Sequence, residues 1–348
     1  MIQLSTTSVE NYTTTSQWKA QLSQSRITCA SLLKHLELES HPLASSEAEK
    51  LFELRVPPRY LSKIKKGDPN DPLLLQILPQ KQEFIEAPGF SDNPLDESEY
   101  NPVQGLFHKY KNRVLLIASA TCAINCRYCF RRTFPYEEHR QAKEDWQAAI
   151  DYIRRNQDVD EVILSGGDPL IQSNRSLLWL LTQLDSIGHV TRLRIHTRIL
   201  TSLPERLDDE LFSGLSNLNT DLVMVTHCNH PNELGEDLAE TFTRLRSANI
   251  VLLNQSVLLK DINNKVEILN QLSKQLFALG ILPYYLFLLD KVSGASHFQV
   301  PILEAKQLYR SLQATLPGYL LPRLSAEIPG YPSKTLVNFH SENDSIFS

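Results

Sequence analysis

Residues 113–132 read RVLLIASATCAINCRYCFRR. The first eight of them form an apolar run with a β-branched start, which predicts a buried strand. Three cysteines follow within one short loop, at the spacing Cys122-x3-Cys126-x2-Cys129. In a reducing compartment, cysteines clustered in this way indicate a metal site, because their thiols stay reduced and free to bind a metal.

The run at 113–120 is the first of six similar apolar runs, and the others lie at 159–166, 192–197, 221–227, 251–259 and 282–290. Amphipathic stretches that predict helices separate them, for example at 144–156, 175–187, 204–216 and 233–248. Because successive runs start about 30 to 45 residues apart, each repeat has the length of a βα unit. The sequence therefore predicts an α/β fold with a parallel sheet, curled or open, and helices outside it.

Each predicted strand ends in polar or reactive residues. In parallel α/β folds the active site lies at the carboxyl ends of the strands, so this pattern predicts an enzyme-like barrel. The chain has only 12 glycines, which makes the adjacent pair after the second strand conspicuous. Beyond the cysteine cluster, the strand ends carry Gly166-Gly167-Asp168, His196-Thr197-Arg198, Thr226-His227-Cys228-Asn229-His230, Asn254-Gln255 and Asp290.

The first hundred residues have a different pattern. Residues 18–38 and 45–66 carry apolar residues at helical spacing and predict short helices. Residues 67–80 and 91–105 are rich in turn-forming residues, so they are expected to be ordered connections rather than a second core. The predicted division is an N-terminal helical region and linker at 1–105, a barrel core at 106–300 and a C-terminal segment at 301–348.

Composition excludes several classes of protein. With 35 basic and 40 acidic side chains the net charge is −5, which argues against general nucleic-acid binding. The apolar run at 281–289 is far shorter than the roughly 20 residues of a membrane helix. The N-terminus has neither a basic nor an apolar signal region, so a cytoplasmic protein is expected.

The chain has five cysteines, and the two outside the cluster are Cys29 and Cys228. Either could supply a fourth ligand, but both are most simply buried free thiols. A [4Fe–4S] cluster held by three cysteines would leave one iron open for a substrate or cofactor. The alternatives are a zinc site completed by a remote cysteine or histidine, and a metal-stabilised binding module without turnover.

A CxxxCxxC loop directly after the first strand of a β/α series resembles the radical S-adenosylmethionine (SAM) enzymes. The longer string CAINCRYCFRR resembles the lysine 2,3-aminomutase branch of that family, and the resemblance covers roughly residues 67–336. Within the branch, the short C-terminus and DPNDPLLLQILP are most similar to members linked to β-lysylation of elongation factor P. The other matching motifs are HKYKNRVLL (108–116), GGDPL (166–170), THCNHPNE (226–233), NQSVLL (254–259) and PYYLFLLD…HF (283–298).

The resemblance implies a partial (β/α)6 barrel in which Cys122, Cys126 and Cys129 bind a [4Fe–4S] cluster and the open iron chelates SAM. The glycines of the GGD motif permit close backbone approach to the methionyl part of SAM, and its aspartate can accept from the ammonium group. The residues expected at SAM are Gly166, Gly167, Asp168, Gln255 and His227, although a structural role for His227 is an equal alternative.

Members of this branch also use pyridoxal phosphate (PLP). The resemblance places the Schiff-base lysine at Lys334, in EIPGYPSKT, and the phosphate-binding cations at Lys109, Arg113 and Arg198. It places Arg131 at the substrate carboxylate. It places Asp290 and Glu327 at the ε-ammonium group, where Glu327 stands in place of the family's usual aspartate.

The activity implied is the 2,3-amino migration that converts L-lysine to β-lysine, with elongation factor P as the functional link. An aminomutase of another basic amino acid, such as arginine or ornithine, is the nearest alternative. The reaction needs an electron donor such as flavodoxin or ferredoxin. The chain ends 14 residues after Lys334 without a further cysteine, so at most a small homo-oligomer is expected.

Overall fold

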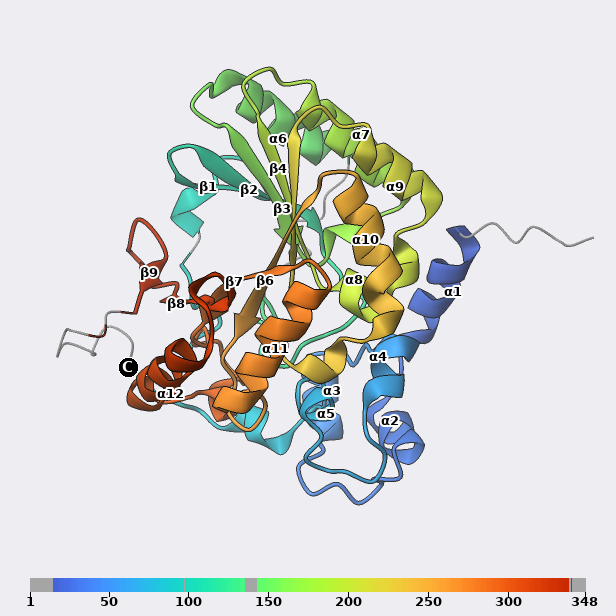
Figure 1. The fold of residues 1–348 in the computed structure, drawn as a ribbon, viewed down its shortest axis with the longest axis vertical. Helices are drawn as coiled ribbons and strands as arrows, with labels where there is room; N and C mark the ends of the chain where they lie inside the picture. The colour runs from blue at the N-terminus through green and yellow to red at the C-terminus, as the bar shows by residue number, and fades with distance from the viewer. Residues whose placement is uncertain (1–14, 97, 135–142, 338, 340–348) are drawn as a thin grey trace, which may run out of the picture.

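The computed structural model describes residues 15–96, 98–134, 143–337 and 339, and one open sheet forms its centre (Figure 1). The strands follow one another in chain order from β1 to β9. Strands β2 to β8 are parallel, whereas β1 and β9 pair antiparallel with β2 and β8 at the two ends. The strands are β1 (Leu106–Tyr110), β2 (Arg113–Ser119), β3 (Glu161–Gly166), β4 (Arg192–Thr197), β5 (Asp221–Thr226), β6 (Val251–Val257), β7 (Leu282–Phe287), β8 (Arg323–Ala326) and β9 (Thr335–Leu336).

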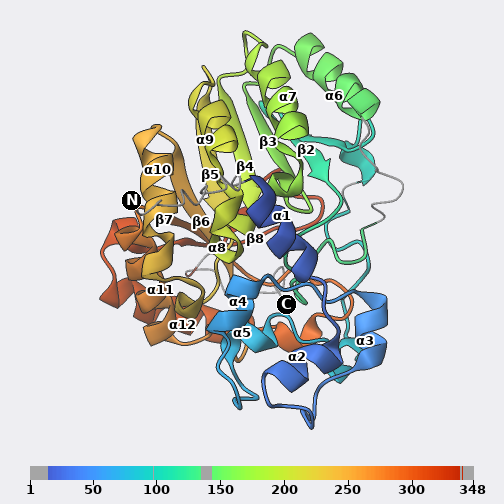
Figure 2. The same ribbon diagram turned by 90° about the vertical axis from the view of Figure 1, so that its right-hand side faces the viewer.

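The six predicted strands are confirmed as β2 to β7. Helices cover the outer face of their sheet, as Figures 1 and 2 show. They are α6 (Lys143–Arg155), α7 (Asn174–Asp185), α8 (Ile199–Ser202), α9 (Asp209–Ser216), α10 (Ala239–Ser247), α11 (Val266–Ala278) and α12 (Ile302–Thr315). Short 3-10 turns connect the elements at η1 (Lys81–Phe84), η2 (Ser98–Tyr100), η3 (Pro169–Ile171), η4 (Pro204–Arg206), η5 (Pro231–Glu233), η6 (Glu236–Leu238), η7 (Ser296–Phe298) and η8 (Gly318–Leu320).

The two faces of the sheet differ because side chains alternate along each strand. In β4, Leu193 and Ile195 are fully buried in the main hydrophobic cluster beneath the helices. Arg194 and His196 point to the opposite, inner face, where Arg194 forms an ion pair with Glu161 of β3 at 2.7 Å. The inner face of the barrel is therefore polar and is where chemistry can take place.

The N-terminal helices are α1 (Thr15–Gln24), α2 (Cys29–His35), α3 (Ser46–Leu51), α4 (Pro58–Lys63) and α5 (Pro72–Leu75). Figure 2 shows α2 to α5 gathered at one end of the sheet. The expectation that residues 67–80 add no second core is wrong. Leu73, Leu74, Ile77 and Leu78 are fully buried in a second hydrophobic cluster, together with leucines of α2 and with Ile124 beside the cysteines.

The C-terminal segment adds β8 and β9, which the sequence did not predict. Glu327 directly follows β8 and Lys334 directly precedes β9, so one turn connects these two residues. In the part of the chain that the structure describes, no helix combines the length and apolar character needed to cross a bilayer. The residues that carried the expectation about a secretory signal are mostly in 1–14, outside the described residues.

Candidate active site

The loop after β2 carries the three cysteines, and this loop (residues 120–132) is called the thiol loop below. Burial raises the pKa of Cys122 well above its usual range, and Asp168 and the other two thiols raise it further. Burial and Cys126 raise the pKa of Cys129 to about 11. Thiolates that influence one another in a dry site need a positive group between them, so this donor set fits a cationic iron–sulfur cluster.

The other two cysteines lie elsewhere, as expected. Cys29 is buried in the second hydrophobic cluster, and Cys228 is buried with its thiol 3.5 Å from the carbonyl of His230. Among the described residues, no three His, Cys, Asp or Glu side chains converge to hold a single metal ion. A [4Fe–4S] cluster does not require such convergence, because each thiolate binds a different iron.

The N-terminal segment fixes the thiol loop from outside. Glu83, in η1, accepts hydrogen bonds from Arg127 Nε at 2.9 Å and from Arg132. The backbone N–H of Asn125 donates to the carbonyl of Arg55 at 3.1 Å. Sequence reasoning missed Glu83, because nothing in its local pattern distinguishes it from a surface glutamate.

The GGD motif supports the thiol loop. Gly166 has φ +112°, and a Cβ on Gly166 or Gly167 would collide with backbone oxygens of Ser119 and Thr121. The backbone N–H of Gly167 also donates to Ser119 O at 2.7 Å. These glycines are therefore needed where β3 meets the thiol loop. The close approach that the structure shows is to the backbone of this loop, whereas the sequence predicted a close approach to SAM.

Asp168 is also committed to the protein. Its buried carboxylate accepts from the Thr197 hydroxyl at 2.8 Å and from the backbone N–H groups of Arg198 and Ile199 at 2.7 and 3.0 Å. Burial raises its pKa despite these bonds. The structure thus ties β3 to the end of β4 through Asp168, instead of leaving the carboxylate open for the ammonium group of SAM.

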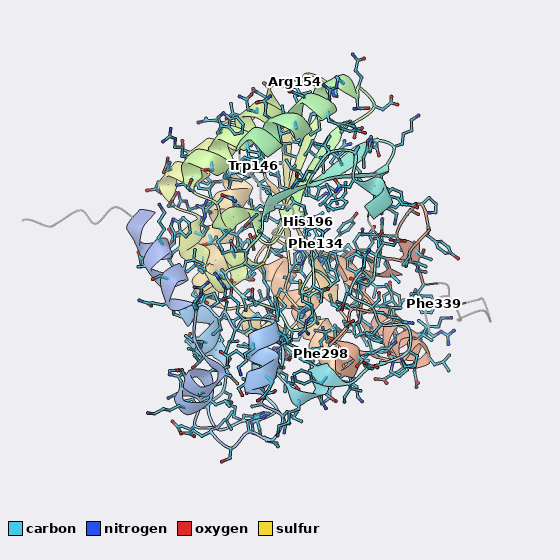
Figure 3. All side chains as sticks on the ribbon, turned by 180° about the vertical axis from the view of Figure 1, so that it is seen from behind. Phe134, Trp146, Arg154, His196, Phe298 and Phe339 are labelled. Carbon is cyan, nitrogen blue, oxygen red and sulfur yellow. The ribbon has the colours of Figure 1, made fainter. Side chains whose placement is uncertain are left out.

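His227 and Gln255, both predicted at SAM, are brought together. Their side-chain nitrogens are 2.8 Å apart, and the ring of His196 lies 5.7 Å from that of His227. Burial and then Arg198 lower the pKa of His227 to about 4, while burial and His227 lower that of His196 well below its usual value. Both imidazoles are therefore neutral at pH 7. Sequence reasoning left His196 (Figure 3) without a role, although strand alternation could have placed it on the inner face.

Arg198 was predicted at the PLP phosphate, but the structure does not bring it together with Lys334 and Lys109. Its Nη1 donates to the sulfur of Cys126 at 2.6 Å, and its Nη2 lies 2.9 Å from a carboxylate oxygen of Glu233. The guanidinium therefore lies behind the thiol loop. The sequence correctly predicted that Arg198 follows the end of β4. The direction of its long side chain, however, depends on Cys126 and Glu233, which are far away in the sequence.

The remaining predicted PLP residues lie at the two ends of the open sheet. Glu327 binds Lys334 Nζ at 2.8 Å and Lys109 Nζ at 3.0 Å. Burial lowers the pKa of Lys334, but the charge of Glu327 outweighs this and raises it overall. Beside them, the guanidinium of Arg113 stacks 3.7 Å from the ring centre of Tyr110. The site thus gathers an amine, two further cations and a carboxylate.

The two other predicted substrate residues are Arg131 and Asp290. Arg131 is buried, and its guanidinium lies about 5 Å from the rings of Phe107, Phe130 and Phe134. Lys334 and Arg131 are also close enough to His196 to lower its pKa electrostatically. Asp290 is half-buried just beyond the end of β7.

The comparison with known proteins shows the family of the chain. Residues 116–271 match the family model described as the radical SAM superfamily. The L-lysine 2,3-aminomutase of Haemophilus influenzae is 50% identical over 306 residues, which cover 88% of this chain and 90% of that protein. The Escherichia coli enzyme of the same name is 47% identical, with 87% and 88% covered, and that of Clostridium subterminale is 34% identical, with 92% and 77% covered. The chain therefore belongs to the lysine 2,3-aminomutase family of radical SAM enzymes, which are isomerases.

Proposed function

We propose that this enzyme converts L-α-lysine to β-lysine by moving the amino group from C2 to C3, with a [4Fe–4S] cluster, SAM and PLP as cofactors. The observation that carries the proposal is the placement of Lys334 beside Glu327 and Lys109, on a barrel that bears the three thiols in the loop after β2. A radical enzyme without PLP would have no evident use for this amine and its neighbouring cations.

The residues present fit both groups. Three thiols on one loop, all free, suit the cluster, and Lys334 with Lys109 and Arg113 suits an aldehyde that carries a phosphate. When bound, the cluster and SAM supply a carbon radical that removes hydrogen, and PLP supplies a conjugated ring that carries the migrating nitrogen. The protein has to bind, orient and enclose the reactants.

Glu327 and Asp290 recognise the distant ammonium group of lysine. Glu327 now balances two cations, Lys334 and Lys109. Once the amine of Lys334 is engaged by the cofactor, Glu327 has one cation fewer to balance and can accept the substrate's ammonium group. This exchange favours a basic amino acid over glutamate, because an acidic substrate would leave the carboxylates unpaired.

Arg131 holds the substrate carboxylate. Its guanidinium is planar and can bind a carboxylate through two parallel hydrogen bonds. The surrounding rings of Phe107, Phe130 and Phe134 keep this end of the site dry. A dry site protects a radical from water and strengthens the charge interactions that orient the substrate.

The proposal extends to the cellular setting. We place the reaction in the cytoplasm, where thiols stay reduced, with flavodoxin or ferredoxin as electron donor and elongation factor P as the destination of β-lysine. At most a small homo-oligomer is expected.

The test is a turnover assay with the full-length protein, reconstituted without oxygen and supplied with SAM, PLP, reductant and L-lysine. We expect β-lysine, and we expect no β-lysine from a Lys334→Ala variant that retains its iron. Parallel reactions with ornithine, arginine and lysine attached to elongation factor P define the substrate. Absence of β-lysine from a protein with a full cluster would refute the proposal.

A further inference from the structure

Arg198 is in direct contact with a predicted cluster ligand, Cys126, and it is only 6% exposed. Besides the contact with Cys126, its guanidinium donates to Gln76 Oε1 at 2.9 Å and to the hydroxyl of Tyr128 at 2.5 Å. Tyr128 lies between Cys126 and Cys129 in the thiol loop. The arginine therefore contacts the loop at two points.

Glu233 fixes the arginine on the side away from the cysteines. One oxygen of its buried carboxylate accepts from the backbone N–H groups of Asn229 and His230, at 2.9 and 3.1 Å. The other oxygen lies 2.9 Å from Arg198 Nη2. Because the carboxylate is itself anchored, it holds the guanidinium at the thiol loop.

One donor of Arg198 is left over. In the part of the chain that the structure describes, its buried Nε–H has no hydrogen-bond partner. A buried donor without a partner is destabilising, so its presence in a native protein calls for an explanation such as a redox role or a bound group that completes it. The spare donor and the contact with Cys126 both direct this arginine to the group that the thiols bind.

We propose that Arg198 is a positioning residue for the cluster, not for PLP: it donates to the sulfur of Cys126 and raises the reduction potential of the bound [4Fe–4S] cluster. Hydrogen bonds to cluster sulfurs and nearby positive charge favour the reduced form, because reduction adds one negative charge. Glu233 limits this rise in reduction potential, because its negative charge offsets part of the positive charge of Arg198. This inference rests on the cluster of the proposed function and is independent of lysine and PLP.

The experiment is a one-electron redox titration of the reconstituted full-length protein without lysine or PLP, followed by electron paramagnetic resonance. We expect Arg198→Gln to lower the midpoint potential, so that at the wild-type midpoint the ratio of reduced to oxidised cluster falls about tenfold, a shift of about 59 mV. We expect Glu233→Gln to raise the potential, because the arginine charge is then less compensated.

Arg206→Gln is the matched control. Arg206 is equally buried, but its guanidinium donates to Asn174 Oδ1 at 2.7 Å and to the carbonyl of Gln172 at 3.0 Å, both outside the thiol loop. Its substitution should leave the potential unchanged. If both Arg198→Gln and Glu233→Gln hold a full cluster at the wild-type potential, the inference is overturned. If Arg198→Gln binds no iron, the Glu233→Gln protein decides. A wild-type midpoint potential in Glu233→Gln then overturns the inference by itself, whatever the outcome of the lysine assay.

Discussion

Lys334 shares the carboxylate of Glu327 with Lys109, and this pairing governs how PLP would be loaded. Only a neutral amine attacks an aldehyde, whereas Glu327 raises the pKa of Lys334 and keeps it protonated. We expect loading to accelerate as the pH rises towards that pKa. In Glu327→Gln the charge that raises this pKa most is gone, so a larger fraction of the amine is neutral at pH 7.5 and loading should be faster than in wild type.

Stopped-flow absorbance of the visible PLP band measures this rate, and Glu327→Asp is the control because it keeps the charge. Equal loading rates for wild type and Glu327→Gln across the pH range would contradict the assigned role of the ion pair.

His297 makes the protein sensitive to acid. Burial lowers its pKa to about 4, and in the described part of the chain neither ring nitrogen has a hydrogen-bond partner. Between pH 4 and about 6.5, His297 binds a proton in the unfolded chain but stays neutral in the folded protein. The free energy of unfolding therefore falls as the pH drops. By pH 5 the loss from this residue should reach about 2 kcal/mol.

His297→Leu should remove that loss and stabilise the protein at pH 7 by about 1 kcal/mol, because two unpaired buried nitrogens disappear. Urea unfolding at pH 7 and pH 5 measures both effects. His35→Leu, on the exposed end of α2, should leave the pH dependence of wild type in place.

Candidate residues could be named from the sequence by two routes, and their roles stay predictions. The three cysteines follow from the CxxxCxxC spacing, and Lys334 follows from the family resemblance. Partners were less predictable. Arg198 and Asp168 were placed at the correct strand ends, but their contacts depend on Cys126 and Glu233 and on Thr197, which only the folded sheet brings near.

At the scale of elements, the junction between β3 and the thiol loop depends on Gly167. A Cβ there would collide with the backbone of Thr121, one residue before Cys122. We expect Gly167→Ala to displace the loop, to cost about 1–3 kcal/mol of stability and to reduce the iron bound per chain. Gly188→Ala is the control, because a Cβ added to Gly188 would meet no atom within 4 Å. Iron analysis and thermal unfolding of both variants test this prediction. Equal iron contents in Gly167→Ala and Gly188→Ala would contradict the role of Gly167 at the thiol loop.

The N-terminal segment holds the thiol loop through Glu83, whose side chain is fully buried between Arg127 and Arg132. Removing one partner of a buried ion pair typically costs about 3–5 kcal/mol, so Glu83→Gln should lose that much stability and part of its iron. Asp237→Asn provides the comparison. It breaks another contact of the N-terminal segment, to Arg59, but its side chain is 46% exposed and the loss should stay below about 1 kcal/mol. Equal losses would contradict a specific role for Glu83.

Helices and strands with a strong periodicity of apolar residues were predictable from the sequence, and those without such a periodicity were not. The six strands and four of the helices between them follow from alternation and amphipathic spacing. Residues 73–78 form a nearly continuous apolar run, and their burial depends on leucines of α2, some forty residues earlier. Strand β8 has only four residues, too few for a clear pattern. The boundaries at residues 105 and 300 stay predictions.

At the scale of the molecule, an ion pair connects the two ends of one open sheet. Figure 1 shows β1, β8 and β9 on the same side, and there the ion pair between Lys109 and Glu327 joins β1 to the segment after β8. The thiol loop lies at the carboxyl end of β2, beneath the N-terminal helices. Lys334 and Arg131, which follows the cysteines, both act electrostatically on His196, so the inner face is the part of the barrel that the two regions share.

The most direct measurement uses L-lysine carrying ¹⁵N on its α-amino group, with the anaerobically reconstituted full-length enzyme, SAM, PLP and reductant. Mass spectrometry of the product then locates the label. The account predicts β-lysine with the ¹⁵N bound to C3 and none released as ammonium, because the nitrogen migrates within one molecule. Release of the label, its retention on C2, or no β-lysine from protein with a full cluster would contradict it.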